Sequence, residues 1–381
     1  MEPVPSTSSA DFTNQAILGI LSIIDESSKN GTPKLGLLLA IINFCTKTAS
    51  EIGALPEQML ITGDDLALAY LEVHWMHAIP YQGQDEPLIQ IGNLNRDHFA
   101  VKICKELRDT LEEDNAKVSV LNSWEASQEA LTQSHQKLFK KRIRETKEIL
   151  WKNAVPRLQN LEGTQINFLY AVQTGSRNLL LNSNIPDLLL TFGPVLKVLI
   201  ERRFAQIVEK LNPQVAGIQL ADTIYAHLFM SNERVMPGVS TRKELGALQG
   251  GRCIWSGERI DRNSPADHVI PWHRKSISVV ENFVLTTPSV NSRKSSHLIS
   301  ALLLERWLNY LSPNLKAFSE IGAESNLISD PSRCIRELRG LYFISEGAPL
   351  WNGPGRMRAP DPREILDCQE MLTEFISANN L

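Results

Sequence analysis

The sequence predicts a mainly α-helical chain that carries one small α+β insert. Apolar residues recur at helical spacing through most of the first 240 residues. The pattern changes at Gly250, where short segments rich in β-branched and aromatic residues alternate with glycine and polar residues. Helical spacing returns beyond Pro313. We therefore expect a disordered tail at residues 1–12, a large helical domain at residues 13–240, a small α+β module at residues 241–312, and a helical segment at residues 313–381 whose helices pack back.

Three helices are expected in the first 80 residues. Residues 12–27 place isoleucine and leucine at helical spacing, and residues 34–50 are apolar nearly all round, which is typical of a buried helix. Its most apolar part, LGLLLAIINFC, is about half as long as a membrane span, so we expect no membrane segment. Asp64 can cap a third helix that extends to Ala78 and is ended by Pro80.

The third helix carries two histidines at helical spacing. His74 and His77 stand at i and i+3, which would supply half of a metal site. The sequence offers no apparent third ligand, so packing or surface roles are the preferred interpretation of both residues.

The rest of the helical domain is also expected to be helical. Its predicted helices span residues 98–115, 123–151, 167–211 (with breaks near Pro186 and Pro194) and 220–232. Pro237 and Gly238 then indicate a linker into the α+β module.

Composition limits the classes of function. The net charge is −4, so a nucleic-acid site would have to be a local basic patch. The five cysteines are far apart and form no CxxC pair, which favours a reducing cytoplasm over a disulfide framework. The first residues have no basic stretch ahead of an apolar core, so we expect no signal peptide.

One dense basic cluster lies in the helix expected at residues 123–151. A charge run of this kind is more often a solvated helix face, and the alternative is a helix that contacts phosphates. The cluster consists of Lys137, Lys140, Lys141, Arg142, Arg144 and Lys147.

The α+β module begins with a predicted hairpin. The segment GGRCIWSGERI has the glycine punctuation of a short hairpin, and DHVIPW and NFVLT are expected to form two further strands. Residues 292–311 are then expected to be helical.

The two later strands and the start of that helix carry an acid, a base, two amides and a lysine. Hydrolysis of a phosphodiester needs a base to activate water and a cation to neutralise charge on the phosphate. His268 can be the base, and the oxygens of Asp267 and Asn291 suit a hard divalent cation. Asn291 is expected at a helix N-terminus, which favours anions, and Lys294 follows one turn later.

This pattern resembles that of the HNH, or ββα-metal, nucleases over residues 250–311. The order of the five residues is similar to that in the HNH domain of RNA-guided CRISPR nucleases. That variant has asparagine, here Asn291, in place of histidine at the last position of the H-N-H motif. The resemblance implies that Asp267 and Asn291 bind Mg²⁺ or Mn²⁺ and that His268 is the general base. It also implies that Asn282 braces the loop and orients the histidine ring, with Lys294 as a further catalytic residue.

Many HNH nucleases bind a structural zinc ion, and this sequence lacks most of the residues that bind it there. Those members have two CxxC knuckles, whereas this chain has Cys253 and Ser256 in the first and Thr287 and Val290 in the second. Three of the four ligands are missing, so we expect no structural zinc. Tryptophan packing at Trp255 and Trp272 is one way to fill the space.

The N-terminal helices resemble those of stand-alone bacterial HNH proteins from restriction and antiphage loci. The shared feature is an apolar helix followed by a His–Trp and Pro–Tyr segment, HWMHAIPY in this chain. The resemblance implies a role in antiviral defence, with DNA as substrate and a second copy or a defence protein as partner.

The leading hypothesis is therefore a divalent-metal-dependent DNA endonuclease of the cytoplasm. A non-cleaving nucleic-acid-binding or regulatory subunit with a scaffold HNH fold is the alternative, and an RNA-cleaving nuclease is the third. Further candidate nucleic-acid contacts near the centre are His273, Arg274 and Arg293, while a surface or packing role is favoured for His273 and His297.

Overall fold

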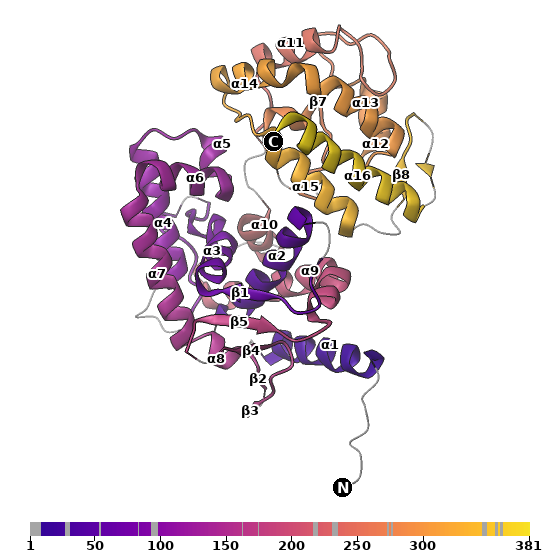
Figure 1. Ribbon diagram of the computed structural model, residues 1–381. Helices are drawn as coiled ribbons and strands as arrows, with labels where there is room; N and C mark the ends of the chain where they lie inside the picture. The colour runs from indigo at the N-terminus through magenta and orange to yellow at the C-terminus, as the bar shows by residue number, and fades with distance from the viewer. Residues whose placement is uncertain are drawn as a thin grey trace. The chain divides into compact units, whose positions relative to one another are not determined.

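The protein is described by a computed structural model and forms two compact units (Figure 1). The first unit comprises Met1–Thr48, Ala54–Asn115 and Trp124–Asn232, and the second comprises Ala49–Gly53, Ala116–Ser123 and Glu233–Leu381. The described residues are 9–26, 31–52, 55–82, 84–92, 98–161, 163–173, 175–215, 220–230, 235–272, 274–275, 277–344, 349–354, 357–358 and 361–381. None of the helices in these ranges combines the length and apolar character needed to cross a membrane.

The first unit is mainly helical, as the sequence predicts. Its helices are α1 (Ser9–Glu26), α2 (Pro33–Ile52, of which residues 49–52 belong to the second unit), α3 (Gly63–His74), the 3-10 turn η1 (Met76–Ala78), α4 (Phe99–Glu113), α6 (Trp124–Ser134), α7 (Gln136–Lys152), α8 (Val155–Leu158), α9 (Ile185–Leu211) and α10 (Leu220–Phe229). The buried character expected of α2 is confirmed, because Leu37, Leu38 and Ile41 are fully buried.

Short strands replace part of one predicted helix in the first unit. An antiparallel sheet has the order β1 (Leu60–Thr62), β5 (Asn178–Leu181), β4 (Tyr170–Val172), and β2 (Asn160–Leu161) pairs with β3 (Thr164–Gln165). The helix expected from residue 167 was therefore wrong up to residue 184. β5 is extended because it pairs with strands on both sides, one of them more than a hundred residues earlier in the chain.

Helix boundaries in the first unit also differ from the prediction. α1 begins at Ser9, so residues 9–12 are helical and the expected tail was wrong there, while residues 1–8 lie outside the described range. The helix expected at residues 123–151 divides at His135, whose φ of −126° and ψ of 34° are not helical. Thr62, not Asp64, caps α3 by accepting a hydrogen bond from Asp65 N.

The second unit contains the remaining elements, most of which share one core. They are α5 (Val118–Leu121), α11 (Val239–Leu248), β6 (Ala266–His268), η2 (Val280–Asn282), β7 (Phe283–Leu285), α12 (Pro288–Lys294), α13 (Ala301–Leu311), η3 (Ser312–Asn314), α14 (Leu315–Glu324), α15 (Pro331–Ile344), β8 (Leu350–Trp351), β9 (Met357–Arg358) and α16 (Pro362–Asn379). Phe283, Trp307, Phe318, Tyr342 and Trp351 are fully buried in this core. Residues 241–312 and 313–381 are thus packed together in one body.

Within residues 250–311, the first predicted hairpin is confirmed, whereas the predicted helix is divided. Arg252 and Arg259 pair across a tight antiparallel turn, as expected for the first hairpin. The single helix expected at residues 292–311 is instead two helices, α12 and α13. Ser295 separates them, because its φ of +47° lies in the left-handed region and ends α12.

Three histidines of the first unit form a buried cluster. His74, His77 and His98 are at most 3% exposed, and the His74 ring lies 4.5 Å from the His98 ring and 5.1 Å from the His77 ring. His74 Nδ1 lies 2.8 Å from the Tyr70 carbonyl oxygen. The packing is tight, since a Cβ on Gly36 would come 2.7 Å from His74 Cε1. Of the packing and surface positions preferred from the sequence, His74 and His77 thus take the packed, buried one, and His98 joins them.

Burial of these rings opposes their protonation. Desolvation lowers the pKa of His74 to about 4 and places the pKa values of His77 and His98 well below their ordinary range. In an unfolded chain a histidine has a pKa of about 6.5. The unfolded state therefore binds more protons below that pH, and the first unit loses stability as the pH falls from about 6.5 toward 4.

The substitution His74→Gln removes one of these titrating groups. The variant should have a lower free energy of unfolding than the wild type. This difference should shrink by up to about 1.4 kcal/mol per pH unit as the pH falls through this window, because only the wild type loses the His74 contribution. Urea unfolding followed by circular dichroism at several pH values measures the difference. His135→Gln is the control, because His135 is partly exposed. A pH-independent difference for His74→Gln would contradict the expectation.

Candidate active site

The residues singled out in the sequence lie on β6, on the turn η2 that leads into β7, and on the short helix α12 that follows β7. β6 pairs with β7 so that Asp267 stands opposite Val284 and His268 opposite Phe283. α12 follows β7 directly, after two threonines. Asp267 is 6% exposed and His268 is 1% exposed, so both side chains are buried in the described structure.

Lys294 lies at the centre of this arrangement. Its ammonium donates a hydrogen bond to the backbone oxygen of His268 at 2.5 Å and lies 3.3 Å from Asp267 Oδ2. The lysine side chain is fully buried. A buried ammonium is stable only with compensating charge and hydrogen bonds, and Asp267 supplies the charge. One side chain thereby joins the last turn of α12 to both functional positions of β6.

Asn282 holds the loop between the two strands. Its side-chain oxygen accepts a hydrogen bond from Ile270 N at 2.7 Å. Its amide nitrogen donates to the carbonyl oxygens of Ile277 at 3.1 Å and Ile270 at 3.4 Å. The residue is fully buried, so these bonds are made away from water. Asn282 therefore fixes both ends of the loop that follows His268.

The His268 ring lies between two aromatic side chains. Its centroid is 4.4 Å from that of Phe283 on β7 and 5.4 Å from that of Trp272 in the loop. Phe283 is fully buried, whereas Trp272 is half-buried. The two contacts orient the imidazole, and Trp272 is the less enclosed of them.

Asn291 does not stand at the N-terminus of its helix. α12 begins at Pro288 with Thr287 as its N-cap residue, because proline fits the first turn of a helix. The expected anion-binding position of Asn291 at a helix N-terminus was therefore wrong. Asn291 is half-buried and lies three residues before Lys294, so the two side chains share one face of the helix.

The charged residues expected to contact nucleic acid have different surroundings. Arg274 Nε donates to the Ser296 carbonyl oxygen at 2.7 Å, and burial lowers the pKa of Arg274. Arg293 is exposed on α12, and His273 lies outside the described residues. His297 lies between α12 and α13, where its Nδ1 is 3.1 Å from the Lys294 carbonyl oxygen.

The basic residues of α7 divide into two groups. Arg142 pairs with Glu106 at 2.6 Å and Glu145 at 2.5 Å, and Lys147 pairs with Asp64 at 2.6 Å. The others are exposed, namely Lys137, Lys140, Lys141 and Arg144.

Glu281 is a buried acid that sequence reasoning missed. It is fully buried beside Asn282, and it accepts hydrogen bonds from Ser329 Oγ and, at 3.1 Å, from Asp330 N. Burial raises its pKa to about 7. The available signal was a single carboxylate inside the apolar run VVENFVL.

Two of the four positions compared above with zinc-knuckle cysteines are part of the apolar packing, while Ser256 and Thr287 are half-buried. Cys253 and Val290 are both 1% exposed. Trp255 is 2% exposed, and its ring lies 6.1 Å from that of Trp351 in an edge-on contact. The five cysteines of the chain are all free and buried.

The side chains of Asp267 and Asn291 carry the type of oxygen atom that binds a hard divalent cation. Asp267 offers carboxylate oxygens and Asn291 an amide oxygen. Lys294 contacts Asp267 through the Oδ2 atom. A carboxylate has about four lone-pair positions, so this one contact does not occupy all of them. Within the described ranges, no three His, Cys, Asp or Glu side chains come together as metal ligands. A metal ion here would thus need other oxygens, from water or substrate.

Comparison of the chain with protein-family profiles, curated proteins and solved structures gave no match.

The ion pair of Lys294 and Asp267 can be tested by substitution. Lys294→Met should lower the free energy of unfolding by roughly 3–5 kcal/mol, because it leaves a buried carboxylate without this cation. Adding Asp267→Asn should recover part of the loss. Urea unfolding measures both, with Arg293→Gln as an exposed control. A loss for Lys294→Met no larger than that of the control would contradict the role given to the pair.

Glu281 should give the second unit the opposite pH dependence to that of the buried histidines. Its folded pKa of about 7 lies above the value of about 4.3 for an unfolded glutamate. The folded state therefore binds more protons between these values, and Glu281 stabilises the fold more as the pH falls. Glu281→Gln should be less destabilising at pH 8 than at pH 5 when compared with wild type in urea unfolding. An equal cost at both values would exclude the raised pKa.

Proposed function

We propose that this chain is a DNA endonuclease that hydrolyses phosphodiester bonds with one divalent metal ion, Mg²⁺ or Mn²⁺. The observation that supports the proposal best is the strand–strand–helix arrangement around Lys294. Asp267 and the backbone of His268 lie against this one lysine of the following helix. An acid and a base thus occupy consecutive positions of one strand, next to the helix that carries Asn291, and these are the residue types that metal-assisted hydrolysis uses.

Asp267 and Asn291 are the proposed metal ligands. When bound, the metal ion would neutralise charge on the phosphate and stabilise the leaving oxygen. Lys294 lies 3.3 Å from Asp267 Oδ2 and holds this carboxylate in place. Arg293, exposed on the same short helix, is available to a neighbouring phosphate of the substrate.

His268 is the proposed general base. It would accept a proton from the attacking water, for which it must come within hydrogen-bond distance of that water. Its ring is 1% exposed and contacts Phe283 and Trp272, so access for the water requires a neighbouring group to move. Trp272 is the half-buried one and belongs to the loop, whereas Phe283 is paired in β7. Asn282 keeps the two ends of this loop fixed during such a movement.

A second candidate function is favoured by the same burial. In a non-cleaving nucleic-acid-binding or regulatory subunit, Lys294 would be the permanent partner of Asp267 and the covered His268 would be a packing residue. Binding would then be indifferent to Asp267→Ala. A role in antiviral defence and a partner from such a system rest on the resemblance to HNH proteins alone, and a place in the cytoplasm rests on the spacing of the cysteines.

Cleavage of supercoiled plasmid tests the proposal. With Mg²⁺ or Mn²⁺ the wild type should produce open circles, because one site cuts one strand and double-strand breaks need a second copy or successive nicks. His268→Ala should slow this reaction by about 10²–10⁴-fold. His297→Ala, a nearby histidine outside the site, should cut at a rate close to that of the wild type.

Three outcomes of this assay would redirect the assignment. Intact plasmid with either ion would favour the non-cleaving subunit. Faster cleavage of a matched RNA than of DNA would favour an RNA nuclease. Equal rates for the wild type and His268→Ala would remove His268 from the role of base.

A further inference from the structure

The exposed face of α7 is almost entirely basic. Residues 139, 143, 146 and 150 are buried, and the opposite face points to solvent. The exposed residues of the helix are Gln136, Lys137, Lys140, Lys141, Arg144, Glu148 and Lys152. They follow the i, i+3, i+4, i+7 spacing of a single helical stripe. Five cations and one carboxylate therefore lie along one line, in a chain whose net charge is −4.

The cations of this stripe are not used by the fold. Arg142 and Lys147 point sideways and pair with Glu106 and Asp64 on the neighbouring helices α4 and α3. By contrast, no described carboxylate pairs with Lys137, Lys140, Lys141 or Arg144. Their charges are thus available to an anion in solution.

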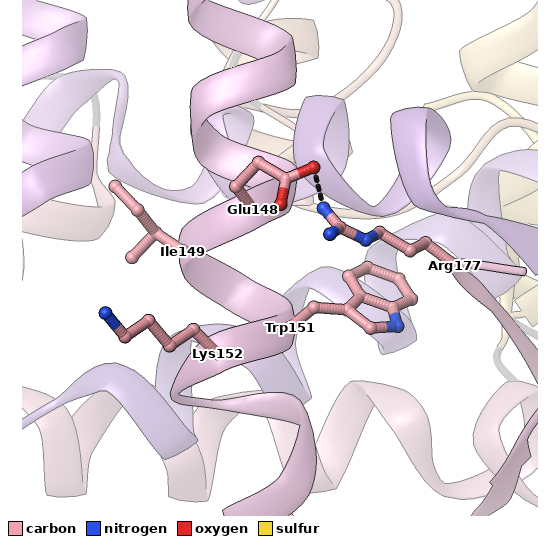
Figure 2. A pocket seen from close by; sticks show the side chains of 5 residues that line it. All are labelled: Glu148, Ile149, Trp151, Lys152 and Arg177. Atoms are coloured by element: carbon pink, nitrogen blue, oxygen red, sulfur yellow. Dashed lines mark ion pairs between the residues drawn. The ribbon is translucent and has the colours of Figure 1, made fainter.

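The stripe leads to a cavity at the C-terminal end of α7. The cavity has a volume of about 520 Å³ and is lined by Glu148, Ile149, Trp151, Lys152 and Arg177. Figure 2 shows Arg177 reaching over from the turn between β4 and β5 to pair with Glu148, above the indole of Trp151. The indole N–H has no hydrogen-bond partner among the described residues. An aromatic ring and two cations, one of them paired with Glu148, therefore line one hollow.

We propose that this stripe and cavity bind single-stranded nucleic acid. The backbone phosphates would lie along Lys137, Lys140, Lys141 and Arg144, and one unstacked base would enter the cavity against Trp151. From Lys137 to Lys152 the helix rises roughly 22 Å, which is long enough for several nucleotides of a single strand. A line of cations beside an aromatic platform is the arrangement used by proteins that bind single strands without sequence preference.

A single strand suits these features better than a duplex or an acidic peptide. A duplex keeps its bases stacked and paired, so none is available to the cavity. An acidic peptide would satisfy the lysines but would not use the aromatic wall. The cavity's one carboxylate, Glu148, is already neutralised by Arg177. This inference concerns residues of the first unit alone and does not depend on cleavage by the second.

Fluorescence anisotropy with a labelled oligothymidylate of about a dozen nucleotides tests the proposal, and EDTA is included so that no cleavage interferes. The variant Lys140→Gln, Lys141→Gln, Arg144→Gln should bind at least about tenfold more weakly than the wild type in about 50 mM salt. It should also lower the slope of log K against log salt by about 2, since each phosphate contact contributes about 0.7 for a single strand. The matched control removes three exposed lysines elsewhere, Lys102, Lys210 and Lys316, and should leave both quantities near those of the wild type.

Substitutions of Trp151 provide a second test of the proposal. Trp151→Leu should weaken binding about tenfold through loss of stacking, while Trp151→Phe, which keeps an aromatic face, should bind nearly as well as the wild type. Circular dichroism confirms that each variant is folded. His268→Ala should bind like the wild type, so failure of the proposed nuclease and failure of this surface are distinguishable.

Several results would overturn the proposal. One is that the triple α7 variant binds oligothymidylate as tightly as the wild type does. Another is equal binding by Trp151→Leu and Trp151→Phe. Tighter binding of a duplex than of the single strand would assign the surface to double-stranded DNA, and equal competition by polyglutamate would assign it to acidic proteins.

Discussion

The buried ammonium of Lys294 is the constraint on which the candidate site depends. A lysine side chain without access to water must have a negative partner and hydrogen-bond acceptors within reach. Asp267 and the carbonyl oxygen of His268 provide them. Because these groups belong to the middle and end of β6, satisfying the lysine sets the distance between α12 and the hairpin. The helix end, the strand and the two functional positions are therefore fixed by one side chain, while Asn282 independently fixes the loop.

The sequence predicted the two strands and the loop contacts of Asn282 better than the surroundings of the other candidate residues. Both strands and the bracing role of Asn282 follow from local pattern and resemblance, and the structure places them as expected. The burial of Lys294 and the position of Asn291 inside α12 do not follow, because they depend on where Pro288 starts the helix and on what packs over it. Glu281 was missed for a similar reason, since its partners Ser329 and Asp330 come from a loop far along the chain.

The fold was predictable where a helix is continuous and buried, and less so where long-range pairing decides. α2 is apolar nearly all round, and its conformation follows from that pattern alone. β5 carries the run NLLL, which is compatible with helix or strand, and only its pairing with β1 and β4 makes it extended. Pro194 was expected to interrupt a helix but lies inside the continuous α9. Ser295, with no glycine or proline beside it, breaks a helix that the sequence predicted to be continuous.

The lysine contact at position 268 is made with the backbone and not with the imidazole. Any residue that is compatible with β6 presents the same carbonyl oxygen, so the fold of the site does not require histidine at this position. A substitution at position 268 therefore separates two roles of the residue: the backbone contact with Lys294 stays, while the ring contacts with Phe283 and Trp272 are lost. The proposed base can thus be removed without removing the acceptor that Lys294 uses.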